Sequence, residues 1–297
     1  MDIRAFKGLN NVTDPLRTGT GWLTVADNVN ITDSGSIAVR EGYSRTKTGS
    51  FSSVYATKDF QRLYLVDGTI LKTVDDVVLV SGLSLNTMYW AEINDQVFFN
   101  NGVDSGIIYP DNRVEAWRRP ITVNKFIGAD GKELEALLDP LPLGTDVIQF
   151  WKGRAYAAQY MPSEDQTVIW FSLPLGFHLF SLDSDYIVVP GHVRMLAPHD
   201  DALIIGTNAK VFAYDGAKLD ELADYGVVPG QHWALDDKRV IFWTLRGACE
   251  ALPFKNLTEK SVSVAPGIQA GGTIVRQGGQ KRYLVALQQG GSAFNSL

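Results

Sequence analysis

Four histidines carry most of the metal-binding and acid–base potential of this sequence of 297 residues. No two of them stand two or four residues apart, the spacings at which a strand or a helix places both rings on one face. His199-Asp200-Asp201 adds carboxylates to one histidine, but the run follows Pro198 and precedes an apolar stretch, as a polar turn before a strand does. The spacing therefore predicts no metal site. The four are His178, His192, His199 and His232.

Cys249 is the one cysteine of the sequence, which excludes an intrachain disulfide and fits synthesis in a reducing compartment. It lies in the strand-like run 247–252, with no His or Asn close to it in sequence. We interpret it as a small, half-buried hydrophobic residue and not as a nucleophile.

The carboxylates and hydroxyls also fall in turn-like segments. Residues 163–170 (SEDQTVIW) are similar to the Asp-box hairpin of sialidase-type propellers, but Thr167 and Ile169 replace its Gly and Thr, and that box is a structural element. We interpret the segment as a polar turn before a strand over 167–172. Acidic pairs at 75–76, 183/185 and 236–237 do not by themselves place two carboxylates face to face, as glycoside hydrolysis requires. The sequence thus predicts no catalytic residue, no cofactor site and no enzyme.

A recurring strand-turn-strand unit must position whatever function the chain has. The clearest copy, residues 202–216 (ALIIGTNAKVFAYDG), has an apolar run, a short polar turn, a second alternating run and a closing glycine. The mean spacing of the copies is about 44 residues, which is typical of propeller blades. The units begin at Arg62, Gln96, Arg154, Ala202, Arg239 and Arg282.

Short runs rich in Val, Ile, Tyr, Phe and Trp alternate with Gly-containing turns, which we place at 67–68, 101–102, 215–216 and 271–272. Such turns favour antiparallel meanders. The fold class predicted is all-β, a β-propeller of about six four-stranded antiparallel blades, with five or seven as alternatives and few or no helices. The single helix candidate is 131–138 (GKELEALL), which ends before Pro140.

Two segments differ from the repeats. Residues 1–50 contain two strands around a turn at 33–35, and we expect them to complete the closing blade of a propeller formed by 51–297. Residues 117–144 form an insertion or long loop, for which a solvated connector is the alternative to a functional role. Within it, Arg118, Arg119, Lys132 and Glu133 are the candidate protein-contact residues.

Charge and hydropathy exclude several classes of partner. The net charge is −6, and the basic residues do not cluster beyond Arg118-Arg119, which disfavours tight or sequence-specific binding of nucleic acid. No apolar run is long enough to span a bilayer, and the first residues lack the apolar core of a secretion signal. We therefore expect no membrane-spanning segment and synthesis in a cytoplasm.

An ordered set of short motifs resembles bacteriophage tail proteins. Residues 26–43 (ADNVNITDSGSIAVREGY) resemble a segment near the N-terminus of many such proteins, with an Asn-Val strand, a Gly turn and an Arg-x-Gly-Tyr-like ending. The other matching segments are 6–11, 168–174, 203–207, 211–214, 225–231 and 240–247. The resemblance implies a virion structural protein akin to tail nozzle, hub and packaged-DNA-stabilisation proteins, which are propellers arranged as rings that hold or conduct DNA.

From this resemblance we expect a noncatalytic tail component located in the virion and synthesised in the host bacterial cytoplasm. Its expected partners are other tail proteins, further copies of itself in a ring around the tail axis, and passing DNA that it does not bind sequence-specifically. Two alternatives remain: a host-recognition propeller that binds surface glycan, and a propeller glycosidase. The glycosidase requires two carboxylates converging near the central channel.

Overall fold

The computed structural model describes residues 5–32, 34–40, 42, 44–119, 123–127, 131, 133–277, 280–290 and 294–296. These residues form strands and turns and contain no helix, so none of them could cross a membrane as a helix. The prediction of an all-β fold is confirmed.

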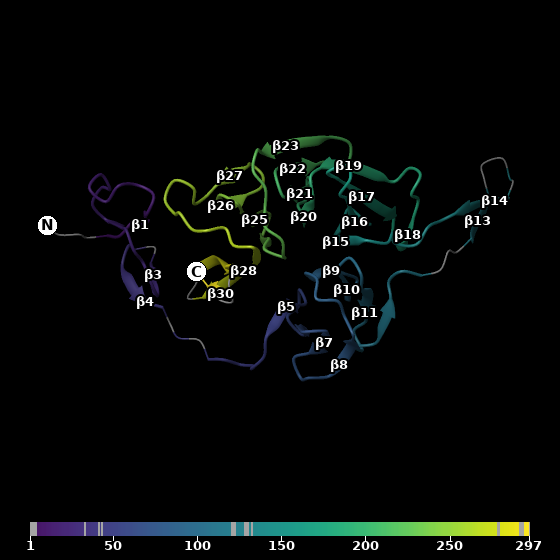
Figure 1. Ribbon diagram of the computed structural model, residues 1–297, viewed down its shortest axis with the longest axis horizontal. Coiled ribbons are helices and arrows are strands. Elements are labelled where there is room, and N and C mark those ends of the chain that lie inside the picture. The colour runs from purple at the N-terminus through teal and green to yellow at the C-terminus, as the bar shows by residue number, and fades with distance from the viewer. Residues whose placement is uncertain are drawn as a thin grey trace.

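Five antiparallel blades follow one another along the chain and around an axis (Figure 1). Each contains four strands hydrogen-bonded in sequence order, and the third blade carries an extra strand, β18 (Gly176–Phe180), on the end of β17. The first blade is β5 (Phe51–Ala56), β6 (Leu63–Asp67), β7 (Ile70–Thr73) and β8 (Val78–Ser81). The second is β9 (Tyr89–Ile93), β10 (Gln96–Asn100), β11 (Ser105–Ile108) and β12 (Val114–Ala116). The third is β15 (Thr145–Trp151), β16 (Arg154–Met161), β17 (Gln166–Leu173) and β19 (Tyr186–Pro190). The fourth is β20 (Val193–Pro198), β21 (Leu203–Thr207), β22 (Val211–Tyr214) and β23 (Leu219–Ala223). The fifth is β24 (Ala234–Asp236), β25 (Arg239–Thr244), β26 (Gly247–Glu250) and β27 (Lys255–Asn256).

The sequence repeat corresponds to the middle hairpin of each blade. The first five units become β6–β7, β10–β11, β16–β17, β21–β22 and β25–β26, and the sixth becomes β29 (Gln280–Gln288). Strand β29 lies between β28 (Gln269–Gln277) and β30 (Phe294–Ser296) in a three-stranded sheet. The propeller prediction is therefore confirmed with five blades, and the sixth unit belongs to this smaller C-terminal sheet.

Neighbouring blades pack through buried aromatic side chains. Phe98 of the second blade contacts the ring of Phe150 in the third edge-on, with ring centroids 4.8 Å apart. Between the same blades, Asn100 Nδ2 donates a hydrogen bond of 2.7 Å to the carbonyl oxygen of Thr145. Burial of apolar surface stabilises the packing of the two blades without regard to direction. The edge-on ring contacts have a preferred geometry and so favour one angle between the sheets.

The C-terminal sheet packs on the fifth blade. Leu287 and Ala270 are buried there with Trp243, and the Lys281 ammonium contacts the carboxylates of Asp236 and Asp237 at 2.8 and 2.6 Å. On its other side, a cavity of about 1,220 Å³ separates β28 from β5 of the first blade. We call this cavity the seam. It shows that the last sheet does not pack tightly against the first blade.

Residues 271–272 are not a turn, and that prediction was wrong. Both glycines lie inside β28, where the main-chain N–H of Gly272 donates to the carbonyl oxygen of Gln231 at 3.1 Å. A Cβ on Gly272 would lie 2.6 Å from the carbonyl oxygen of His232. The second glycine thus permits close approach of two backbones and does not provide turn geometry.

The N-terminal segment forms two small sheets of its own. Strand β1 (Gly8–Leu9) pairs in parallel with β2 (Trp22–Leu23), and β3 (Val29–Ile31) pairs antiparallel with β4 (Ile37–Val39) as predicted. Among the residues described, these strands pair with no blade strand. Asn11 joins the segment to the loop after β27, with hydrogen bonds to Ser261 and Ser263. Completion of the closing blade by residues 1–50 therefore stays a prediction.

The insertion at 117–144 contains a pair of antiparallel strands, β13 (Val123–Ile127) and β14 (Glu133–Leu137), that projects from one end of the molecule (Figure 1). The helix expected over 131–138 is wrong for 133–137, because these residues extend to pair with β13. The helical spacing of Leu134, Leu137 and Leu138 is thus overridden by tertiary pairing.

Candidate functional site

The candidate contact residues Arg118 and Arg119 lie at the base of the projecting hairpin. Arg118 Nε donates to the carbonyl oxygen of Leu141 at 3.2 Å. Arg119 contacts Glu115 at 2.9 Å and donates to the hydroxyl of Tyr109 at 3.3 Å. Both guanidinium groups therefore support the base of the hairpin.

The other two candidate residues belong to the hairpin itself. Glu133 begins β14, and Lys132 lies outside the described residues. Contact of these four residues with another protein stays a prediction.

The histidines do not converge. His199 lies in a turn, where its Nδ1 accepts a hydrogen bond of 3.1 Å from the main-chain N–H of Asp201. His192 contacts Asp146 at 3.3 Å and stacks on Tyr160, with ring centroids 4.2 Å apart. No group of three His, Cys, Asp or Glu side chains that could hold a metal ion occurs in the described ranges. Cys249 is buried beside Tyr225 and Thr244, and burial raises the pKa of its thiol.

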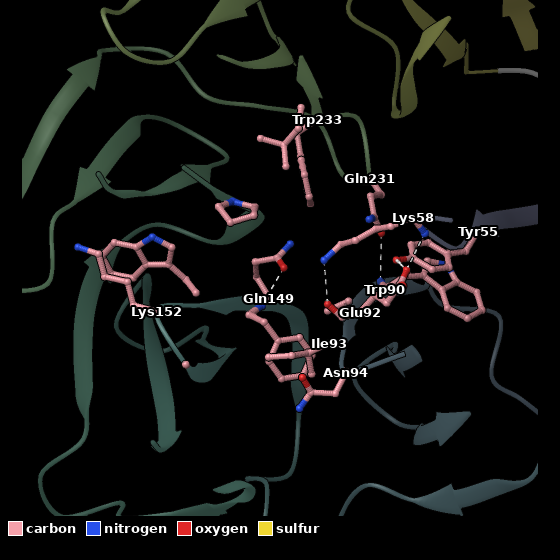
Figure 2. A pocket seen from close by; sticks show the side chains of 16 residues that line it. Tyr55, Lys58, Trp90, Glu92, Ile93, Asn94, Gln149, Lys152, Gln231 and Trp233 are labelled. Atoms are coloured by element: carbon pink, nitrogen blue, oxygen red, sulfur yellow. Dashed lines mark hydrogen bonds between the residues drawn. The ribbon is translucent and has the colours of Figure 1, made fainter. Parts of the chain in front are cut away.

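The axis of the propeller contains a cavity of about 280 Å³, which we call the axial cavity (Figure 2). It is lined by the innermost strands β5, β9, β15, β20 and β24 and by the segments that flank them. Because every blade contributes its first strand, side chains far apart in the sequence meet there. The lining side chains with polar or aromatic groups are Tyr55, Lys58, Trp90, Glu92, Asn94, Gln149, Phe150, Trp151, Lys152, Gln231 and Trp233.

Glu92 is the one carboxylate among the described residues that line the axial cavity, and it is already engaged. It is 9% exposed, and it accepts hydrogen bonds from the main-chain N–H of Lys58 at 2.9 Å and the hydroxyl of Tyr55 at 3.2 Å. Burial and the Glu92 carboxylate raise the pKa of Tyr55, so the hydroxyl remains a donor at neutral pH. Glu92 therefore ties β9 to the end of β5.

Two further polar groups that line the axial cavity are hydrogen-bond donors, the Lys58 ammonium and the Gln149 amide. The Lys58 ammonium donates to the carbonyl oxygen of Glu92 at 3.2 Å, and Figure 2 shows it extending toward the Gln149 amide across the cavity. Gln149 is buried; its Oε1 accepts from the main-chain N–H of Phe150 at 2.8 Å, and its Nε2 makes a long bond of 3.4 Å to Leu196.

Gln231 and Trp233 complete the lining, and Figure 2 shows Gln231 beside Lys58. Gln231 Oε1 accepts a hydrogen bond of 3.1 Å from the main-chain N–H of Trp90, which connects the fifth blade to the second across the axis. That bond leaves Gln231 Nε2 without a protein acceptor among the described residues. The Trp233 indole is half-buried and lines both the axial cavity and the seam. An amide, an ammonium and an indole thus border one space.

Sequence reasoning did not identify this site. The sequence repeat marks the middle hairpins, whereas the lining comes from the strands before them. A signal was present, because Glu92 in YWAEI and Gln149 in VIQFW interrupt apolar strands. A polar residue in such a run must find a partner or a ligand when the strand is buried.

The arrangement suits binding better than acid–base catalysis. Hydrolysis of a glycoside by two carboxylates needs a facing pair, and the described lining of the axial cavity supplies Glu92 alone. The described lining therefore lacks the carboxylate pair that the glycosidase alternative requires.

Comparison with known proteins gives a likeness at the level of fold. No family model and no curated protein matches the sequence. Solved structures that resemble the chain include the extracellular domain of a hybrid two-component system protein from B. thetaiotaomicron, with 12% identity and a TM-score of 0.48. The match covers 86% of this chain but only 33% of that protein. Hydrazine synthase from Kuenenia stuttgartiensis gives 10% identity and a TM-score of 0.46 over 86% of this chain and 99% of that one. Virginiamycin B lyase from Staphylococcus aureus gives 11% identity and a TM-score of 0.39 over 80% and 90%.

Proposed function

We propose that this protein is a noncatalytic structural component of a tailed-phage virion, part of the nozzle, hub or tip ring through which DNA is retained or delivered. The ordered motifs between residues 6 and 247 support the proposal, and so does the distribution of projecting elements around the propeller. In this proposal the protein is located in the virion tail after synthesis in the host bacterial cytoplasm.

One observation carries the proposal. The N-terminal segment and the hairpin β13–β14 extend from opposite ends of the long axis (Figure 1). Both are attached to the propeller by specific contacts, through Asn11 at one end and Trp117 at the other, whose indole Nε1 donates to the carbonyl oxygen of Phe177 at 2.8 Å. Different projections on two sides suit head-to-tail contacts between copies, and such contacts generate a ring when the rotation closes.

The size of the axial cavity limits how DNA would pass. A volume of about 280 Å³ holds roughly nine water molecules at about 30 Å³ each, which is far too little for a duplex. The conduit in this proposal is therefore the hole enclosed by a ring of subunits. The net charge of −6 favours passage over retention by tight binding.

Electron microscopy of phage particles tests the proposal. Particles that lack the protein should have incomplete tails or should lose their DNA, and particles whose copy lacks residues 121–136 should show the same defect. A substitution in an exposed turn away from both projections, Lys238→Ser, is the matched control and should give normal tails. Complete, DNA-filled tails without the protein would overturn the proposal.

A second candidate function, recognition of host-surface glycan, is favoured by the axial cavity. Aromatic faces with amide and charged groups around them are a common way to hold a small polar ligand. Binding of purified protein to a glycan array would support this role, and no binding across the array would count against it.

A further inference from the structure

We propose that the axial cavity binds a sugar residue that carries a carboxylate, with Lys58 and Gln231 on the acid group and Trp233 against the ring face. This inference rests on the glycan-recognition function and names the chemical class of its ligand. It concerns one protomer and does not depend on assembly into a tail.

The polarity of the available groups leads to this class. The Lys58 ammonium has three donor hydrogens and one acceptor among the described residues, the Glu92 carbonyl oxygen. Gln231 Nε2 and Trp233 Nε1 have no protein acceptor in the described part of the chain, and Gln149 Nε2 makes only its 3.4 Å bond. Because these groups donate, they match a ligand rich in acceptor oxygens.

The charged side chains that line the axial cavity also favour an acidic ligand. Lys152 also lines the cavity, but its ammonium lies 4.3 Å from the centre of the Trp151 ring and donates to the carbonyl oxygen of Asp215, outside the donor cluster. Lys58 is therefore the ammonium that faces the space. The Glu92 carboxylate accepts from Tyr55 and from the main-chain N–H of Lys58 on one oxygen, Oε2, and it is the single carboxylate of the described lining against two ammonium groups.

The size and shape of the axial cavity suit one sugar residue. A volume of about 280 Å³ suits roughly a dozen non-hydrogen atoms. Lys58, Gln231 and Trp233 also line the seam, which has room for further sugar residues of an oligosaccharide. The exposed part of the Trp233 indole offers a flat apolar wall for the C–H face of a sugar ring.

Titration calorimetry with matched ligands tests the class. The probes are oligosaccharides that end in glucuronate, galacturonate or sialate, each compared with its own methyl ester, which keeps the shape and removes the charge. At least one acid should bind about 10- to 100-fold more tightly than its ester, the range expected for hydrogen bonds to a charged group.

Three variants locate the site. Lys58→Met keeps the aliphatic stem and should abolish the preference for acid over ester. Trp233→Leu should weaken both ligands. Lys238→Met removes an exposed ammonium from the turn between β24 and β25 and should leave binding unchanged. Circular dichroism and thermal unfolding would show that the variants fold.

The outcomes separate the inference from the function on which it rests. Equal binding of acids and esters would overturn the carboxylate assignment while glycan recognition stood. Unchanged acid binding in both Lys58→Met and Trp233→Leu would place the site elsewhere and overturn the inference. Absence of binding to every saccharide would overturn the recognition function itself.

Discussion

The main-chain N–H of Trp243 donates a hydrogen bond to Nδ1 of His232 at 3.2 Å inside the fifth blade. On the other side of the ring, Nε2 donates to the carbonyl oxygen of Val228 at 2.9 Å. The two bonds require one neutral tautomer, because a protonated ring has no acceptor to offer Trp243. The imidazole is fully buried, and this burial lowers the pKa of His232 to about 4.

The free energy of unfolding should therefore depend on pH through His232. The unfolded chain binds a proton below a pKa of about 6.5 that the folded chain refuses until about pH 4. The contribution of neutral His232 to the free energy of unfolding is fully present above pH 6.5. It is lost as the pH falls toward 4, at about 1.4 kcal/mol per pH unit. Urea unfolding at pH 7.5, 6.0 and 5.0 measures this slope.

The variant His232→Gln is the control for the pH experiment. It removes the titrating group, so its free energy of unfolding should change less between pH 6.5 and 5.0 even if it is lower throughout. An identical slope in the variant and the unchanged protein would contradict the assignment.

Two adjacent glycines in β28 should differ sharply on substitution by alanine. Gly272→Ala brings a Cβ to 2.6 Å from the carbonyl oxygen of His232 and should lower the free energy of unfolding by about 1–3 kcal/mol. Gly271→Ala meets no atom within 4 Å and should stay within about 1 kcal/mol of the unchanged protein. Denaturant titration of both variants decides the point, and equal effects would show that the strands adjust.

Trp117 should be among the most costly side chains to remove. It is fully buried at the base of the hairpin β13–β14, edge-on to Phe98 at 5.1 Å between ring centroids. Trp117→Ala should cost about 3–5 kcal/mol, measured by urea unfolding. Trp117→Phe keeps an aromatic ring but loses the hydrogen bond to Phe177, so its cost should be smaller. A Phe variant as unstable as the Ala variant would argue against this ranking.

The thiol of Cys249 should react slowly in the folded protein. It is fully buried, and burial raises the pKa of the thiol, so little thiolate is present and no reagent reaches it. Reaction with a chromogenic disulfide at pH 8 should be roughly a hundredfold or more slower than in denaturant, since it requires local opening. A fast native reaction would mean that the fifth blade opens readily.

The repeat predicted the architecture because blade hairpins alternate regularly and end in glycine turns. The inner strands, such as β9 and β15, are buried on both faces like the middle strands β21 and β22, but they precede the hairpin whose turn marks the repeat. Leu134 to Leu138 has helical spacing, yet β14 forms because a neighbouring strand satisfies its backbone. Such pairing is a tertiary event that local spacing does not report.

The axial cavity could not be predicted for a similar reason. Lys58, Gln149 and Gln231 are separated by more than eighty residues at each step, and only the ring closure brings them together. The sequence did predict Arg118 and Arg119 as protein-contact residues, because two adjacent basic residues are visible in a local segment. Their observed partners, Leu141 and Glu115, account for that pair without a ligand.

The seam between β5 and β28 gives the propeller two ends. Each blade packs its faces on at most two neighbours, so the first blade and the C-terminal sheet each resemble the terminal repeat of a linear array. A pulling force on either terminus would therefore peel blades one after another instead of rupturing a closed circle at once. Two neighbouring hydrogen bonds, from Trp90 to Gln231 and from Gly230 to the hydroxyl of Tyr89, join the segment before the fifth blade to the second blade, and peeling from either end would have to break both.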